Sequence, residues 1–159
     1  MIEVERKFVC DPRHPAVLAI LERSAPCVIE QGYLIVAGAS GEVRIRRSNG
    51  AARLTIKRGA PPAREEVEVS LDTAQYDRLW PLTAAARLEK ARYRVPFGKE
   101  VIELDVYRGV LSGLVVAEVE FESIEAARAF EAPEWFDREV TEDRRYANQT
   151  LAGADAVPL

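Results

Sequence analysis

The chain has 159 residues, of which 48% are hydrophobic and 30% are charged, and its formal net charge at pH 7 is −4. This length suits one domain with its own core, so we expect a single domain over residues 1–159. The acidic balance argues against general nucleic-acid binding, which normally goes with a net basic domain.

Alternation of apolar and charged side chains predicts the first strand at residues 2–8, because side chains alternate across a pleat. A helix is expected over 15–24, with Pro15 at its start. Short strands are predicted at 31–36, 41–48 and 51–58. The Asn49-Gly50 pair between the last two is a strong hairpin signal.

The second half of the chain continues with the same two kinds of element. Residues 65–71 alternate again, and 72–83 is predicted as a helix that begins at Asp72. Three more strands are expected at 88–97, 100–107 and 114–121, followed by a helix over 123–130. Segment 132–153 has a mixed pattern with a helix expected towards its end. The total is about eight strands with four helical stretches.

Other sequence features exclude several classes of protein. The two cysteines, Cys10 and Cys27, are too few for a disulfide framework, so we expect a reduced, cytoplasmic protein. No apolar run approaches the length of a membrane span, and the charged N-terminus is not a signal peptide. His14, the one histidine, lies beside prolines, which argues against Ser-His-Asp or Cys-His catalysis.

Nearly every predicted strand carries one apolar strip and one ionic strip. On a single strand this is the usual pattern of a solvated face. Across all strands, however, the polar positions are almost entirely ionic, with few of the Thr, Ser and Gln residues that suit strands, and the signs segregate by strand. The ionic strips comprise Glu3, Glu5, Lys7, Arg44, Arg46, Thr55, Lys57, Glu66, Glu68, Lys90, Arg92, Arg94, Glu103, Asp105, Glu118 and Glu120.

The apolar strips need cover, which the helical stretches can provide from outside the sheet. We therefore expect an α+β fold, mainly antiparallel, with a closed eight-stranded β-barrel whose charged faces line a tunnel. Acidic pairs at this spacing lie about 7 Å apart along a strand and offer oxygen ligands to a hard divalent cation. Arginine and lysine rows opposite them can bind phosphoryl oxygens, so the implied ligand is a metal-complexed polyphosphate.

The segment IEVERKF resembles the ExExK signature of the CYTH superfamily, the triphosphate tunnel metalloenzymes. The segments QGYL, VRIR, LTIK, REEVEV, EKARYRV, IELDVY, AEVEF and EVTEDRRYANQTLA follow in the family's order and span almost the whole chain. The ordered set is far more specific than ExExK alone. The resemblance implies a closed antiparallel barrel that hydrolyses, or occasionally cyclises, triphosphates with Mg²⁺ or Mn²⁺.

Carried over residue by residue, the resemblance implies three sets of site residues. The metal ligands would be Glu3, Glu5, Asp105, Glu118 and Glu120. The phosphate contacts would be Lys7, Arg44, Arg46, Lys57, Lys90, Arg92 and Arg144, the last at a position where many relatives have Lys. The catalytic residues would be Glu118 and Glu120, which would hold the attacking water, together with Lys7. Glu66 and Glu68 would organise the basic rows.

Inorganic tripolyphosphate, cleaved to pyrophosphate and phosphate, is the expected substrate. ATP and thiamine triphosphate need a surface for their organic group, whereas Tyr107 is the one aromatic residue plainly on an ionic strip, and we expect Trp80 and Trp135 to pack elsewhere. Two alternatives stay open: a class IV adenylyl cyclase that makes cyclic AMP and pyrophosphate from ATP, and a non-catalytic polyphosphate-binding module. Neither nucleic acid nor membrane is an expected partner, and a homodimer is left open.

Overall fold

The computed structural model describes residues 4–34, 41–59 and 65–159, which form one antiparallel sheet of nine strands. The strands are β1 (Val4–Cys10), β2 (Cys27–Leu34), β3 (Glu42–Ser48), β4 (Ala51–Arg58), β5 (Glu65–Leu71), β6 (Arg87–Phe97), β7 (Glu100–Tyr107), β8 (Val115–Phe121) and β9 (Phe136–Glu139). The α-helices are α1 (Pro15–Arg23), α2 (Thr73–Leu79), α3 (Ile124–Ala129) and α4 (Asn148–Ala152). Short 3₁₀ helices are η1 (Trp80–Thr83), η2 (Gly109–Leu111) and η3 (Arg144–Tyr146). Within the described part of the chain, none of the helices combines the length and the apolar character that crossing a bilayer requires.

Local sequence signals fix several of these boundaries. Asn49 and Gly50 both have positive φ angles, 49° and 76°, as the tight turn between β3 and β4 requires. Asp72 caps α2, because its side chain accepts a hydrogen bond from the backbone of Gln75 at 2.7 Å. The Gln75 side chain in turn accepts from the backbone of Asp72 at 2.9 Å, which completes a capping box.

The expectation of a closed eight-stranded β-barrel is wrong. The strand order is β5-β4-β3-β2-β6-β7-β8-β1-β9, so the described sheet is open, with β5 and β9 at its edges. The sequence does not predict strand β9. This strand pairs with residues 8–10 along the outer edge of β1, the edge that would have to pair with β5 in a closed barrel. The antiparallel pairing is as expected, but alternation within a strand contains no information about whether distant edges meet.

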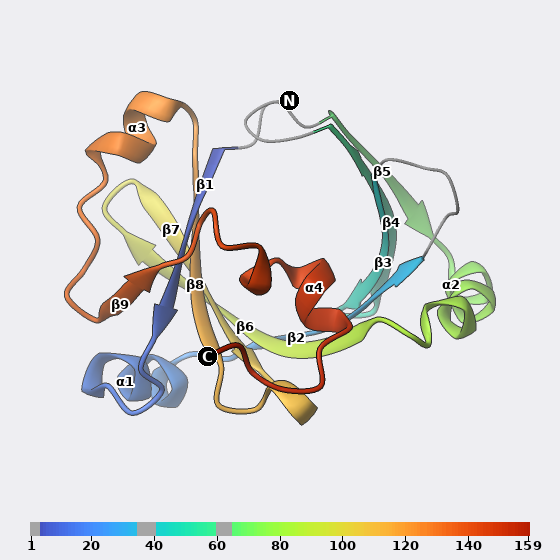
Figure 1. Ribbon diagram of the computed structural model, residues 1–159, viewed down its shortest axis with the longest axis horizontal. Helices are drawn as coiled ribbons and strands as arrows, with labels where there is room; N and C mark the ends of the chain where they lie inside the picture. The colour runs from blue at the N-terminus through green and yellow to red at the C-terminus, as the bar shows by residue number, and fades with distance from the viewer. Residues whose placement is uncertain (1–3, 35–40, 60–64) are drawn as a thin grey trace.

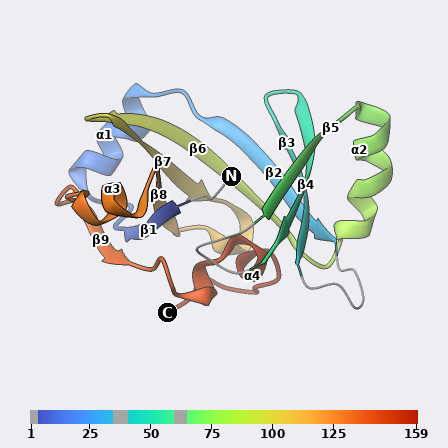
Figure 2. The ribbon, with the colours of Figure 1, turned by 90° about the horizontal axis from the view of Figure 1, so that it is seen from above.

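The sheet curls so that one face is concave and the other convex (Figure 1). Helices α1 and α3 cover the convex face of β1, β7 and β8, and α2 covers that of β3 and β4. Figure 2 shows α1 and α3 at one end of the molecule and α2 at the other. The cluster under α1 and α3 includes Phe8, Val17, Ile102, Leu104, Ala117, Val119 and Ala127. The predicted apolar strips therefore form the core on the convex side.

The C-terminal segment lies inside the curve of the sheet. Helix α4 contacts β2 and β6 from the concave side (Figure 1). Leu151 of α4 belongs to the same buried cluster as Tyr33, Leu88 and Tyr107, which project from that face. This packing fills one part of the concave face with apolar side chains, and most of the predicted ionic residues lie on the rest of it.

Candidate functional site

Cross-strand register places the predicted ionic positions on the concave face. Partners across antiparallel strands point to the same face, and Glu5 partners Glu120 while Arg92 partners Asp105. The predicted site residues on this face are Glu5, Lys7, Arg44, Arg46, Lys57, Lys90, Arg92, Asp105, Glu118 and Glu120. Glu3 lies outside the described residues, and Arg144 is exposed on η3 in the C-terminal segment.

A network of ion pairs, which we call the central network, occupies the part of this face formed by β1, β6, β7 and β8. Arg92 donates two hydrogen bonds to Asp105, from Nε to Oδ1 and from Nη2 to Oδ2, each 2.7 Å long. Lys90 Nζ lies 2.5 Å from Asp105 Oδ2, and both side chains are almost completely buried. Lys7 Nζ lies 3.0 Å from Glu118 Oε1, close enough for an ion pair but without full hydrogen-bond geometry. The members are Lys7, Lys90, Arg92, Glu103, Asp105 and Glu118.

Burial and charge act in opposite directions on this network. Burial alone would raise the pKa of Glu118, but the cations of Lys7, Lys90 and Arg92 hold that pKa well below its usual range. Burial would likewise lower the pKa of Arg92, and the surrounding carboxylates, Asp105 first, raise it instead. For Lys90 burial prevails over the attraction of Asp105 and lowers the pKa. Glu118 and Arg92 are therefore charged at neutral pH.

Strand β3 carries a different arrangement, which we call the arginine pair, Arg44 and Arg46. The Nη2 atom of Arg44 lies 3.4 Å from Thr55 Oγ1, and its buried Nε has no hydrogen-bond partner among the described residues. Burial lowers the pKa of Arg46, and the neighbouring cations of Arg44 and Arg92 lower it further. A buried donor without an acceptor is costly, so this arrangement is suited to receive an anion.

Strand β5 supplies carboxylates to the cations of β4. Lys57 Nζ lies 3.0 Å from Glu66 Oε2, and Arg53 forms an ion pair with Glu68. Thr55 is buried between these pairs, with its hydroxyl 3.4 Å from Glu68 Oε2. The β5 glutamates Glu66 and Glu68 thus contact basic side chains of β4.

Glu5 and Glu120 form the part of the face best suited to a hard cation. Both are exposed, and they are direct partners across β1 and β8. Within residues 4–34, 41–59 and 65–159, no three His, Cys, Asp or Glu side chains converge into a metal-binding group. The carboxylate oxygens of this pair nevertheless have the chemistry that Mg²⁺ and Mn²⁺ prefer. Glu3, two positions before Glu5 in the same strand phase, lies outside the described residues.

Two tyrosines and a glutamine on the concave face add uncharged polar groups. The sequence pattern does not single out Gln31, although its place two residues before Tyr33 puts it in the same phase. Gln31 is buried and donates from Nε2 to the Tyr33 hydroxyl at 2.9 Å. Burial raises the pKa of both Tyr33 and Tyr107. Because both rings are buried, neither offers a flat surface for a ligand to stack on.

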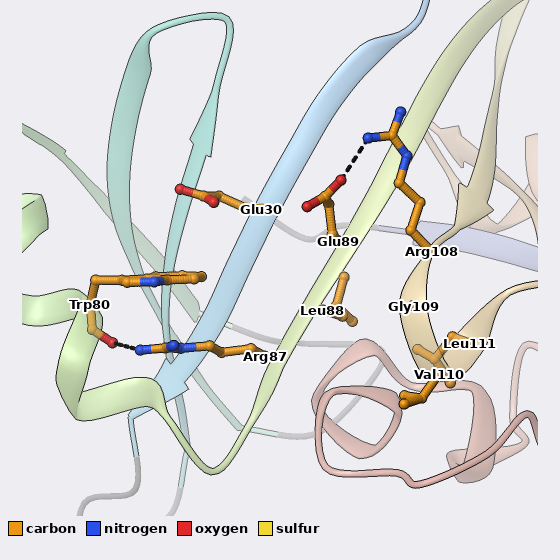
Figure 3. A pocket seen from close by; sticks show the side chains of 9 residues that line it. All are labelled: Glu30, Trp80, Arg87, Leu88, Glu89, Arg108, Gly109, Val110 and Leu111. Carbon is orange, nitrogen blue, oxygen red and sulfur yellow. Dashed lines mark hydrogen bonds and ion pairs between the residues drawn. The ribbon is translucent and has the colours of Figure 1, made fainter.

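A pocket of about 420 Å³ opens beside η1 and η2, and none of the predicted site residues lines it (Figure 3). Its wall includes Trp80, whose indole lies flat against the guanidinium of Arg87, with the Arg87 Cζ 4.3 Å from the ring centre. Arg108 at its rim pairs with Glu89 at 2.6 Å. Trp80 also stacks on Tyr76 of α2, with ring centres 5.4 Å apart, so it packs between helix and sheet as expected.

Comparison with known proteins gives consistent matches over almost the whole chain. The CYTH domain matches residues 1–153. The chain is 42% identical over 154 residues to an inorganic triphosphatase of Nitrosomonas europaea, covering 96% of this chain and 97% of that protein. It is 32% identical to an inorganic triphosphatase of Acetivibrio thermocellus, covering 94% and 92%. A solved structure of an inorganic triphosphatase matches with a TM-score of 0.72 and 37% identity, covering 98% and 97%.

These matches confirm the resemblance seen in the ordered strand motifs. The matched region includes every strand of the concave face and the C-terminal segment that packs inside it. The chain belongs to the CYTH domain family.

Proposed function

We propose that this protein hydrolyses triphosphates on the concave face of its sheet, with inorganic tripolyphosphate as the preferred substrate. The observation that carries this proposal is the arginine pair: the buried Nε of Arg44 has no hydrogen-bond partner among the described residues, and Arg46 lies beside the cations of Arg44 and Arg92. Two similar proteins are inorganic triphosphatases, which supports the same reaction. We place the protein in the cytoplasm as a single domain, since its two cysteines are free thiols, as expected in a reducing compartment.

The cations of the concave face would bind the phosphate chain. Arg44 and Arg46 would each offer a planar fork of N–H donors to phosphate oxygens, and Lys57 would extend this row on β4. Lys7 and Lys90 would continue the positive charge towards the carboxylates of β1 and β8. Arg144 is proposed as a further contact from the C-terminal segment.

The carboxylates would hold the metal ion. We assign this role to Glu3, Glu5 and Glu120, with Glu118 and Asp105 beside them, and to Mg²⁺ or Mn²⁺ as the ion. A bound divalent cation would reduce the charge on the phosphate oxygens and make water more acidic.

The chemical step is an in-line attack by water on the terminal phosphorus. Glu120, whose carboxylate is exposed, would orient that water and accept its proton. The bond from the terminal phosphorus to the bridging oxygen breaks, and pyrophosphate and phosphate are released. The arginine pair and Lys7 would stabilise the charge that builds up on the transferred group and on the leaving pyrophosphate, and no covalent intermediate is required.

The buried aromatic rings favour this reaction over adenylyl cyclisation. A cyclase must hold adenine, but Tyr33 and Tyr107 are buried beneath the described concave face, and Trp80 packs on the other side. A polyphosphate-binding module would explain the cations but would not need the facing carboxylates Glu5 and Glu120.

The test is an activity screen over tripolyphosphate, ATP, thiamine triphosphate and pyrophosphate, each with Mg²⁺, with Mn²⁺ and with neither. Products are separated by ion-exchange chromatography. We expect metal-dependent release of phosphate and pyrophosphate from tripolyphosphate, with kcat/KM well above that for ATP. Cyclic AMP as the main product from ATP, or no cleavage of tripolyphosphate with either metal, would contradict the proposal.

A further inference from the structure

Arg92 carries the same charge as Arg46 and points to the same face of the sheet. Within the described structure, and unlike Arg46, it is directly hydrogen-bonded to several carboxylates. It makes four hydrogen bonds to three carboxylates: two to Asp105, one to Glu103 and one of 3.0 Å to Glu118. A guanidinium has five N–H donors, so these contacts use most of its capacity. A phosphate ion could bind Arg92 well only by displacing carboxylates that already surround it.

Each cation of the central network is paired with a carboxylate. Lys7 pairs with Glu118, Lys90 pairs with Asp105, and Arg92 pairs with Glu103, Asp105 and Glu118. Exposed Arg94 adds a contact of 3.9 Å to Glu103. Arg44 differs, because its buried Nε has no hydrogen-bond partner among the described residues. The donors of Arg92 are therefore mostly occupied by carboxylates, whereas Arg44 keeps a buried donor that suits an external anion.

We propose that Arg92 is a positioning residue, which holds Asp105, Glu103 and Glu118 in fixed orientations and does not itself bind phosphate. This inference rests on the proposed function, because it assigns a role within the same site. Arg92 lies on β6, its main partner lies on β7 and the farthest lies on β8, so one side chain orients carboxylates from two neighbouring strands. Only the forked shape of arginine allows these contacts to form together; a lysine would keep the charge but lose the fork.

The experiment compares Arg92→Lys with Arg46→Lys, two substitutions of the same kind on the same face. Both substitutions keep the positive charge, so both variants should attract an anion at long range about as strongly as the wild type does. Binding of tripolyphosphate is measured by calorimetry with divalent ions removed by EDTA. We expect Arg46→Lys to weaken binding about tenfold, through loss of a charge-assisted pair, and Arg92→Lys to change it less than about twofold.

Thermal unfolding and metal dependence provide independent measurements. Arg92→Lys should lower the melting temperature, whereas Arg46→Lys should leave it unchanged. Arg92→Lys should also raise the Mg²⁺ concentration for half-maximal activity about tenfold, as expected when residues that orient a metal site are altered. A purely structural loss would reduce the active fraction without moving that concentration. Circular dichroism confirms that each variant is folded.

The two possible failures are distinguishable. Wild-type protein that neither binds nor cleaves tripolyphosphate would overturn the proposed function. Wild-type protein that does both, with Arg92→Lys weakening metal-free binding as much as Arg46→Lys, would overturn the positioning role and make Arg92 a phosphate contact. Unchanged melting temperature and metal dependence in Arg92→Lys would overturn it as well.

Discussion

The hydroxyl group of Tyr107 donates a hydrogen bond of 2.6 Å to Asn148 Oδ1, joining the end of β7 to the first turn of α4. Tyr107 is also the cross-strand partner of Lys90, whose Nζ lies 5.4 Å from the centre of its ring. One side chain thus connects the C-terminal helix with the central network. The neighbours of Tyr107 in the buried cluster, Leu88 and Leu151, hold the same helix by apolar packing.

Replacing Tyr107 by Phe should lower the free energy of unfolding by about 1–2 kcal/mol, because the Asn148 amide oxygen loses its donor in a mostly buried setting. Urea denaturation measures the change. Asn148→Ala should cost much less in the Tyr107→Phe background than in the wild type, since the two residues share one interaction. Strict additivity of the two substitutions would show that the hydrogen bond does not contribute.

Replacing Glu5 or Glu120 by Gln should abolish metal-dependent turnover while the protein stays folded. Loss of an anionic ligand to a hard cation removes a few kcal/mol of transition-state stabilisation, on the order of 10²-fold or more in rate. Tripolyphosphate hydrolysis at low Mg²⁺ measures this loss. Glu122→Gln, at an exposed position just after β8, is the matched control and should keep full activity. Near-normal rates in both test variants would refute the ligand assignment.

Replacing Arg44 by Met should reduce kcat/KM for tripolyphosphate about tenfold or more, equivalent to about 1.4 kcal/mol. The same change should leave the melting temperature equal or slightly higher, because it removes a buried donor that has no partner among the described residues. Arg13→Met, on an exposed loop, controls for loss of a positive charge elsewhere. A variant that loses stability but keeps its kcat/KM would indicate a structural role for Arg44.

The two cysteines should differ strongly in reactivity. Burial raises the pKa of Cys10 to about 12, so its reactive thiolate is nearly absent at pH 8. Cys27 is only partly buried, at the start of β2. Titration with a chromogenic thiol reagent should label Cys27 in the folded protein and Cys10 only after denaturation. Equal labelling rates for both in native buffer would contradict this expectation.

Stability should depend on acid pH through the pair formed by Arg6 and Glu139. Arg6 donates to both carboxylate oxygens of Glu139, at 2.9 and 2.7 Å, and these hydrogen bonds lower the pKa of Glu139. A carboxyl group whose pKa is lower in the folded than in the unfolded protein stabilises the fold. This stabilisation is complete at pH values above the unfolded-state pKa of about 4.3, and it is lost as the pH falls through the folded-state pKa.

Glu139→Gln should therefore be less stable than wild type at pH 7, and the difference should shrink towards pH 3. Urea denaturation at both pH values measures it, with the exposed Glu134→Gln as control. A difference that is the same at both pH values would show that the pair does not titrate in this range.

Side-chain alternation was sufficient to predict which residues share a face. Lys7, Lys90 and Glu118 lie on three separate strands, and the strand period of two placed them together with no knowledge of how the strands pair. Chain-local signals also predicted the turn at Asn49 and the cap at Asp72, since both depend on a few neighbouring residues.

The pairing of distant segments was beyond the reach of the sequence pattern. Strand β9 has four residues, too few for alternation to be recognised, and its position beside β1 decides how the sheet ends. The same limit separates Arg92 from Arg46. Both have the phase of the ionic strips, but the register of β6, β7 and β8 brings Glu103, Asp105 and Glu118 into direct ion pairs with Arg92.

The outer strand β5 ends the sheet with one row of backbone groups that pair with no other strand in the described structure. Such a row is a template on which other polypeptides assemble, and exposed Val67 and Val69 would add to the attraction. The neighbouring residues of β5 are acidic and also exposed: Glu65 and Glu66 precede Val67, and Glu68 lies between the two valines. Carboxylates along an exposed edge strand disfavour the pairing of a second molecule with that edge, because the approach would bring like charges together.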